Sequence, residues 1–190
     1  MPGYIKKALQ RLNHKPSPGA QFSPHQHTPF TFLKKGEKQH AKEITETPTL
    51  DKETSRWIQP GIGSLLYYAR ALESTLLPTL NQLGTQQALP TTNPKKALER
   101  ALDYAHTYKN AYLQFNASDM ILHVHSDAAY LVLPQARSCI AGYFRLLSKN
   151  PTTPHNGAML IECKRLKNIC SSAAEAETNR VIHHGIAGVQ

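Results

Sequence analysis

MILHVHSDAAY, residues Met120–Tyr130, is the stretch that decides the fold class of this chain. Aliphatic residues that favour strands alternate with polar residues from His123 onward, which predicts a β-strand. Because successive side chains of a strand point to opposite faces, His123, His125 and Asp127 share one face and the apolar residues between them share the other. A predicted core strand therefore carries a carboxylate.

Further strands and a helix are predicted around this stretch. Tyr112–Phe115 is expected to form a short strand before it, and Arg137–Leu147 and Ala158–Cys163 are expected to form two more after it. Two prolines and an Asn-Gly pair in residues 149–157 predict a turn between the last two strands. A helix is expected to start at Ser171. Antiparallel strands that lead into a helix indicate the α/β (α+β) class.

Asp127 and Glu175 are the candidate catalytic and metal-binding residues. Magnesium is a hard cation that prefers oxygen ligands, and two-metal phosphodiester chemistry begins from carboxylates on neighbouring elements. Asp127 also fits an aspartate that ends a strand in a turn. Glu175 also fits a capping box, Ser172-x-x-Glu175, in which the carboxylate caps the helix start. Both alternatives stay open at the level of sequence.

Short motifs around the two acids occur in a fixed order: S-D-A-A-Y (126–130), R-S with G-Y (137–143), Lys164, and S-S with E-A-E (171–177). This series resembles the RNase H segment of copia-type retrotransposon Pol polyproteins. G-S-L-L-Y with A-R (63–70) resembles the helix that links reverse transcriptase to RNase H there, and residues 1–5 resemble a stretch at the polymerase end. The resemblance implies hydrolysis of RNA–DNA hybrids with Mg²⁺ or Mn²⁺ held by Asp127 and Glu175.

The chain also departs from that family pattern. Ala129 stands where many relatives carry a second acid, and Thr178 stands where a tyrosine usually follows E-A-E. The sequence reaches Gln190 without counterparts of the later catalytic aspartates. The resemblance therefore implies a partial RNase H-like domain that is inactive alone. Two other functions stay open, a non-catalytic nucleic-acid-binding remnant and an interaction module that pairs through an open sheet edge.

Three regions are expected along the chain: a basic, proline-containing arm (1–52), a helical connector (53–109) and the partial RNase H-like domain (110–190). The net charge is +9, and residues 1–42 hold eight Lys/Arg against one acid. Within this arm, residues 2–12 have the spacing of one short amphipathic helix, which in the resembling polyproteins would pack on the polymerase body. Residues from Asn13 to Thr47 are expected to be a disordered or extended linker.

A basic arm on a nearly neutral body suits a nucleic-acid partner, such as an RNA–DNA hybrid. The same pattern fits solvated lysines on a flexible tail. The expected contact residues are Lys6, Lys7, Arg11, Lys34, Lys35 and Lys38. The resemblance adds the rest of the Pol polyprotein as a partner. His25-x-His27 would suit zinc or, without a second pair at finger spacing, a plain loop.

The connector is expected to hold three helices, over residues 53–73, over residues 75–88 and from Asn93 onward. Thr54 or Ser55 is the expected first cap, and Pro60 with Gly61 fits a first turn or a kink better than a helix middle. Its tyrosines are expected to pack in the core rather than to stack on bases.

Composition narrows the setting of the chain. No apolar run approaches the ~20 residues of a membrane span, so no membrane partner is expected. Three cysteines without C-x-x-C spacing favour reduced thiols and an intracellular location, cytoplasmic or nuclear. His123, His125 and Asp127 would suit zinc or simple hydrogen bonding. His183 and His184, late in the last helix, are expected to be solvated or to interact with its C-terminus.

Overall fold

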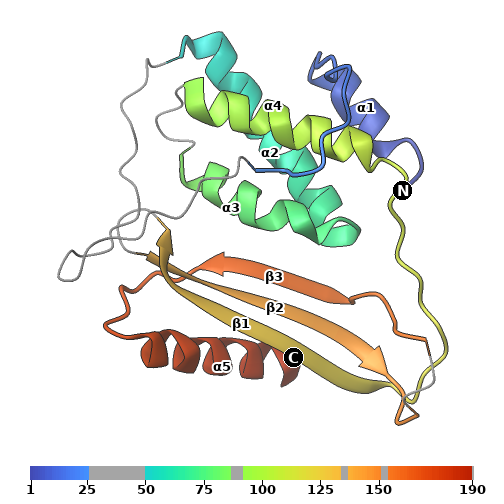
Figure 1. Cartoon of the computed structure of the whole chain (residues 1–190), viewed down its shortest axis with the longest axis vertical. Coiled ribbons are helices and arrows are strands. Elements are labelled where there is room, and N and C mark those ends of the chain that lie inside the picture. The colour runs from blue at the N-terminus through green and yellow to red at the C-terminus, as the bar shows by residue number, and fades with distance from the viewer. Residues whose placement is uncertain (26–49, 87–91, 134–136, 151–153, 190) are drawn as a thin grey trace. The chain divides into compact units, whose positions relative to one another are not determined.

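The structure, a computed structural model, describes residues 1–25, 50–86, 92–133, 137–150 and 154–189. These residues belong to two compact units. The helical unit comprises the described residues up to Tyr112, and the sheet unit comprises those from Leu113 onward. The described chain holds five α-helices and one antiparallel sheet of three strands, so the predicted α/β class is confirmed at this level (Figure 1).

The helical unit consists of α1 (Tyr4–Arg11), α2 (Lys52–Ala71), a 3₁₀ turn η1 (Ser74–Leu76), α3 (Leu77–Thr85) and α4 (Thr92–Thr107). Apolar residues at helical spacing make its core, and Leu65, Leu98 and Leu102 are fully buried. The connector helices therefore form close to where the hydrophobic period predicts them. Within the described residues, no helix is long and apolar enough to cross a bilayer.

The start of α2 differs from the prediction. The cap is Asp51, whose Oδ1 accepts from the Thr54 amide at 2.6 Å, rather than Thr54 or Ser55. Because the helix starts this early, Pro60 and Gly61 lie in its interior. Gly61 serves close packing there, since a Cβ at this position would lie 2.7 Å from Leu98 Cδ2 on α4.

The first helix does not belong to a separate arm. Ile5, Ala8 and Leu9 of α1 are buried, and the helix contacts α2 and α4. The Tyr4 hydroxyl donates to the Ser64 carbonyl of α2 at 3.0 Å. An eight-residue helix is marginal alone in water, so this packing stabilises it. The predicted polymerase body is thus not what covers the apolar face of α1.

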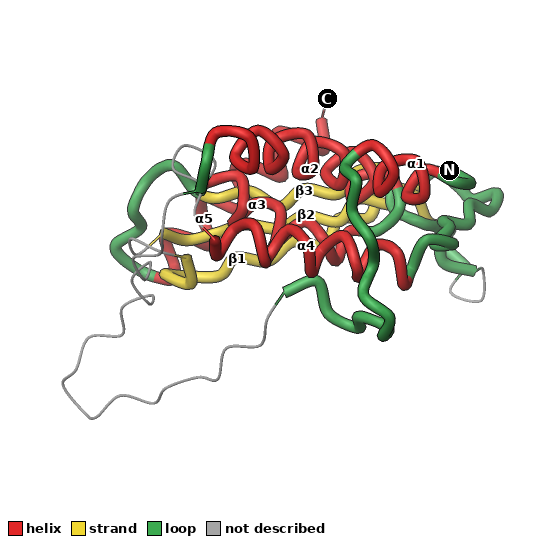
Figure 2. The backbone as a smooth tube through the Cα atoms, turned by 90° about the horizontal axis from the view of Figure 1, so that it is seen from above, coloured by secondary structure: helices red, strands yellow, loops and turns green. Residues whose placement is uncertain are grey.

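Residues 13–25, called the strap below, cross α4 and are hydrogen-bonded to it instead of forming a free linker (Figure 2). Ser17 donates to the Asp103 carboxylate, the Gln21 amide donates to Thr107 Oγ1 at 3.0 Å, and Arg100 Nε donates to the Ser23 carbonyl at 3.2 Å. The strap has no helix or strand, and it is hydrogen-bonded to the helical unit rather than free. The remaining linker residues, 26–49, lie outside the described residues.

The sheet unit consists of β1 (Ile121–Leu133), β2 (Arg137–Leu147), β3 (Leu160–Arg165) and α5 (Ala173–Val189). The sheet order is β1-β2-β3, with both pairs antiparallel, and α5 packs against β1 and β2 (Figure 1). The bounds of β2 coincide with the prediction, β1 extends to Leu133, and β3 is shifted by two residues. A bulge interrupts the pairing of β1 between Ala129 and Leu133.

The strand predicted at Tyr112–Phe115 does not form. Residues 111–120 have no regular secondary structure. Their backbone instead pairs with the loop before β3, where the Gly157 amide donates to the Gln114 carbonyl at 2.9 Å and the Asn116 amide donates to Asn156 Oδ1 at 2.5 Å. Among the described residues, no strand therefore pairs with the outer edge of β1.

The register defines two faces of the sheet. Ile140 of β2 is buried in a core with Ala176 of α5 and with Leu166 and Cys170 of the loop before that helix. Ala128 of β1 packs against this core. This side is called the helix face below. Ala128 pairs with Ile140, and side chains alternate along each strand. The residues next to these two, such as Asp127 and Ala141, therefore point to the opposite side, called the far face.

Candidate functional site

Asp127, the first candidate ligand, lies on the far face. It pairs with Ala141, next to the Ala128–Ile140 pair that lies under α5. Its side chain is solvent-exposed, and its Oδ1 accepts from the Ala128 amide at 2.9 Å. The predicted strand position is confirmed, and the pleat directs the carboxylate away from the helix that carries Glu175.

Glu175, the second candidate, closes the start of α5. The Glu175 amide donates to Ser172 Oγ at 3.1 Å, and its carboxylate accepts from the Ser171 amide and the Ser171 hydroxyl, both at 2.7 Å. These hydrogen bonds from Ser171 lower the pKa of the Glu175 carboxyl. Of the two alternatives that the sequence leaves open, the structure forms the capping arrangement.

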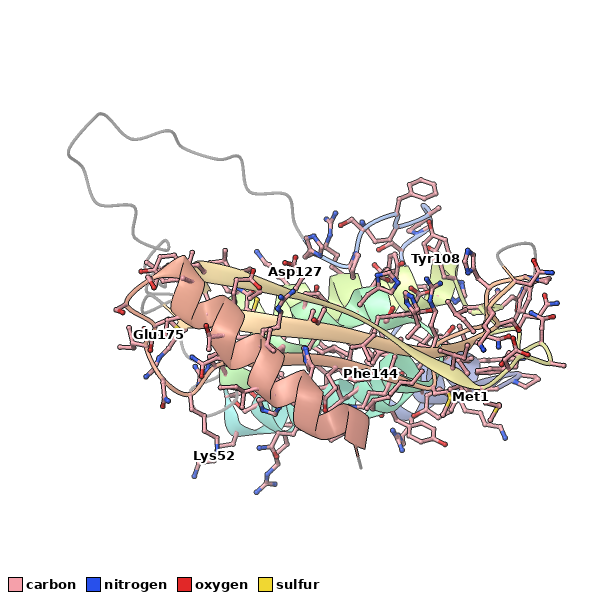
Figure 3. All side chains as sticks on the ribbon, turned by 90° about the horizontal axis from the view of Figure 1, so that it is seen from below. Met1, Lys52, Tyr108, Asp127, Phe144 and Glu175 are labelled. Carbon is pink, nitrogen blue, oxygen red and sulfur yellow. The ribbon has the colours of Figure 1, made fainter. Side chains whose placement is uncertain are left out.

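The structure therefore does not bring the two carboxylates together. Figure 3 shows Asp127 on β1 and Glu175 at the first turn of α5, apart from one another. Within the described residues, no group of three His, Cys, Asp or Glu side chains stands at metal-binding spacing. A two-metal site needs carboxylates that converge on both ions, and these two residues do not fit that requirement.

His123 and His125 share the far face with Asp127, as predicted. Their ring centroids lie 5.0 Å apart, and Arg145 Nη2 donates to His125 Nε2 at 3.0 Å. Because a guanidinium only donates, this ring nitrogen carries no proton and acts as the acceptor. His125 thus takes part in hydrogen bonding on this face, the second of the two alternatives, and His123 contacts its ring.

A polar cluster lies on the helix face, beneath α5. His184 is 3% exposed, its Nε2 lies 3.9 Å from Glu162 Oε2, and its ring meets Phe144 edge-on. Gly142 makes room for it, since a Cβ there would lie 2.8 Å from His184 Nε2. The prediction of a solvated His184 is therefore wrong, because the second of the paired histidines faces the sheet.

Two cations border this cluster. Lys164 Nζ lies 2.6 Å from Glu162 Oε1, and Arg180 Nη1 donates to the Ser126 carbonyl at 2.6 Å. Arg180 also pairs with Glu177 at 2.8 Å. Burial lowers the pKa of His184; Glu162 opposes this, and His183, Lys164 and Arg180 add to it. This cluster was not predicted from the sequence. The signal for it in the sequence is the alternation of Glu162 with Lys164, and the structure pairs Glu162 with the small Gly142.

The candidate nucleic-acid contacts fall into three groups. Lys6 and Lys7 are exposed on α1. Arg11, in contrast, donates to Ser64 Oγ, so part of its guanidinium serves packing between α1 and α2. Lys34, Lys35 and Lys38 lie outside the described residues, as does His27 of the proposed His25-x-His27 pair.

Comparisons of the chain with protein-family models, with curated proteins and with solved structures found no match. The residues and their geometry therefore carry the functional argument.

Proposed function

We propose that the sheet unit is a fragment resembling the RNase H segment of copia-type Pol polyproteins, and that it does not cleave RNA–DNA hybrids by itself. The supporting observation is the element order: three antiparallel strands with Asp127 on the first, followed by α5, which carries Glu175 in its first turn. This is the order in which the resembling segment presents its first two acids. The resemblance supplies the chemical class, RNA–DNA hybrid hydrolysis.

The absence of cleavage follows from where the two carboxylates point. Two ions must be held together so that the attacking and the leaving oxygen are stabilised at once. Asp127 lies on the far face, whereas the Glu175 carboxylate accepts two hydrogen bonds from Ser171 at the start of α5. An exposed single aspartate would hold Mg²⁺ or Mn²⁺ weakly, with most of the ion's water retained.

Nucleic acid is the partner that the charge of the chain favours. The net charge of +9, with Lys6 and Lys7 exposed on α1, supports phosphate contacts that are independent of sequence. An RNA–DNA hybrid, the rest of a Pol polyprotein and an intracellular location belong to this proposal through the family resemblance.

A cleavage assay tests the proposal. A fluorescently labelled RNA–DNA hybrid is incubated with the full chain in Mg²⁺ and, separately, in Mn²⁺, with an active ribonuclease H as the positive control. We expect binding without cleavage. Cleavage that is lost in both Asp127→Asn and Glu175→Gln would show that the two acids converge in solution. Cleavage that survives both substitutions would overturn the RNase H assignment itself.

A second candidate function has its own observation. The outer edge of β1 has no strand partner among the described residues, and Leu122 and Val124 are partly exposed. An open edge of this kind pairs with other strands, so the chain would act as an interaction module. Concentration-dependent association, with neither hybrid binding nor cleavage, would favour this function over the first.

A further inference from the structure

A pocket of about 710 Å³ lies within the helical unit, between α1, the strap and the end of α4. Its floor is apolar, with Ile5 and Leu9 buried beneath it and Pro16 at the side. Its volume falls in the range of about 300–1,000 Å³ that is typical of small-molecule sites. All the described residues that line it belong to the helical unit, whereas Asp127 and Glu175 belong to the sheet unit.

The pocket wall is cationic and rich in amides. Lys6 of α1 and Lys109, just beyond α4, both line it, and the described lining residues include no acid. The side chains of Gln10, Asn13 and Asn110 add donors and acceptors, and His106 adds a further ring nitrogen. Two lysines above an apolar floor suit a ligand with an anionic end and a flat apolar part.

The acid that is bonded to His14 of the pocket lining is fully engaged in hydrogen bonds. Asp103 of α4 accepts from His14 Nε2 at 2.8 Å and from both the amide and the hydroxyl of Ser17. Burial alone would raise the pKa of Asp103, but these hydrogen bonds outweigh burial and hold the pKa below its usual value. The Asp103 carboxylate is thus paired with residues of the strap, and it leaves the positive charges of Lys6 and Lys109 available to a ligand.

The pocket is held in shape before any ligand arrives. Asn13, with φ of 49°, closes α1 in a Schellman motif: the Asn13 amide donates to Gln10 and the His14 amide donates to Leu9, at 3.1 and 3.0 Å. The Trp57 indole donates to the Leu12 carbonyl at 2.6 Å and fixes the same turn. A preformed site does not have to be ordered when the ligand binds, which favours affinity.

We propose that this pocket binds a phosphate monoester that carries a flat ring, the class of the nucleoside 5′-monophosphates. Lys6 and Lys109 contact the phosphate, the ring lies on the floor of Ile5 and Leu9, and the amide side chains contact its polar edge. The ligand is either a free nucleotide or the 5′-phosphorylated end of a strand, because both present the same group. This site goes beyond the proposed function, which concerns the sheet unit.

The chain reports binding through its single tryptophan. The Trp57 ring centroid lies 6.4 Å from that of His14, which lines the pocket. The full chain is titrated with adenosine 5′-monophosphate while Trp57 fluorescence is followed, and the affinity is checked by calorimetry. Adenosine, ribose 5-phosphate and inorganic phosphate serve as partial ligands. A 5′-phosphorylated oligonucleotide is compared with the same strand lacking the phosphate, which separates the two sources.

We expect saturable binding of the monophosphate that exceeds that of each partial ligand by about tenfold or more, since a charge-assisted contact or the ring contact is missing in each. Lys6→Gln and Lys109→Gln should each weaken binding by about tenfold or more. Lys15→Gln on the strap and Lys96→Gln on α4 are matched controls, exposed but outside the lining, and should leave the affinity for the monophosphate unchanged.

Three results would overturn the proposal. The first is the absence of saturable binding of the monophosphate by both methods. The second is equal binding by adenosine or ribose 5-phosphate, which would remove the phosphate or the ring from the argument. The third is an equal loss in the Lys15→Gln control, which would reduce the effect to the overall charge of the helical unit. All four lysines are exposed, and their substitution should therefore leave thermal unfolding unchanged. Unchanged unfolding of the variants shows that a loss of affinity does not come from a loss of folding.

Discussion

Nε2 of His184 lies 3.9 Å from Oε2 of Glu162, with the histidine on α5 and the glutamate on β3. Both atoms are buried, and neither has a hydrogen-bond partner within the described residues. Buried polar atoms without partners are costly, so the cluster is retained against a free-energy penalty. It joins the last helix to the sheet edge farthest from β1 and makes the docking of α5 sensitive to protonation.

The first prediction is that the sheet unit loses stability as the pH falls from about 6.5, the ordinary pKa of histidine, toward the lower pKa of His184 in the folded chain. The pKa of His184 lies below its ordinary value of 6.5, because burial outweighs the Glu162 carboxylate while His183, Lys164 and Arg180 repel a proton. The unfolded chain then binds the proton more readily, so the contribution of His184 is full above about pH 6.5 and declines below it.

Thermal unfolding of wild type, His184→Gln and His183→Gln from about pH 8 to about pH 5 checks this dependence. His183 is exposed beside His184 and serves as the matched control. The other titrating groups are common to all three chains, so the difference between the curves isolates the two histidines. A wild-type pH slope that persists in His184→Gln, or disappears in His183→Gln, contradicts the assignment.

The second prediction concerns Gly142. A Cβ there would lie 2.8 Å from His184 Nε2 and 2.9 Å from Phe144 Cε2, so Gly142→Ala forces the ring and α5 outward. Overpacking of this kind costs about 1–3 kcal/mol of folding free energy. Chemical denaturation measures it. Gly185→Ala is the control: beyond its own helical turn, no atom of the described residues lies within 4 Å of an added Cβ, and in a helix that change stabilises by about 0.5–1 kcal/mol.

The contact itself is tested by a double-mutant cycle. Gly142→Ala should cost less in the His184→Ala background, because the ring that meets the new methyl group is gone. Equal cost in both backgrounds would mean that Phe144 or the strand backbone, rather than His184, opposes the methyl group.

The third prediction separates capping from metal binding at α5. Ser172→Ala removes the acceptor for the Glu175 amide and should cost about 0.5–2 kcal/mol of stability. Glu175→Gln should also lower the melting temperature, since its hydrogen bonds from Ser171 weaken when the charge is lost. Asp127→Asn, at an exposed position, should leave it unchanged.

Melting each variant with and without magnesium completes this test. If Glu175 caps the helix, all shifts are independent of the ion. A magnesium-dependent rise in the wild-type melting temperature that both Glu175→Gln and Asp127→Asn abolish would place the two carboxylates on one metal and refute the capping assignment.

The fourth prediction concerns the salt dependence of nucleic-acid binding. Each phosphate contact contributes about 0.9 to the slope of log affinity against log salt on duplex DNA. Lys6 and Lys7 are exposed on α1, so the double Gln variant should reduce the slope by about 1–2. Lys95→Gln with Lys96→Gln on α4 removes the same charge elsewhere. An equal reduction in both pairs would show that net charge alone, not α1, sets the binding.

Local pattern was sufficient for most elements of the fold. The bounds of β2 follow from its run of β-formers between turn residues, and the connector helices follow from their hydrophobic period. The strap and the packing of α1 were not predictable, because they depend on partners far along the chain, such as Asp103 and Ser64. A proline-containing sequence without hydrophobic periodicity has the same pattern whether or not it is hydrogen-bonded to a helix.

The candidate site was predictable only as far as its elements. The positions of Asp127 on a strand and Glu175 at a helix start follow from sequence, and so does the capping pattern of Ser172. Which face of the sheet α5 covers depends on packing in three dimensions. The burial of His184 depends on the same choice, so the sequence left both the polar cluster and the separation of the acids unpredicted.

The pairing of Ala128 with Ile140 determines that Asp127 lies on the face of the sheet away from α5, which carries Glu175. Because a strand repeats every two residues, a slip of β1 by one residue against β2 would carry Asp127 under α5 and move Ala128 out. The letters of a motif survive such a slip unchanged, whereas the chemistry does not. A one-residue change of register would therefore exchange an acid for a methyl group beneath the helix, without altering any residue of the motif.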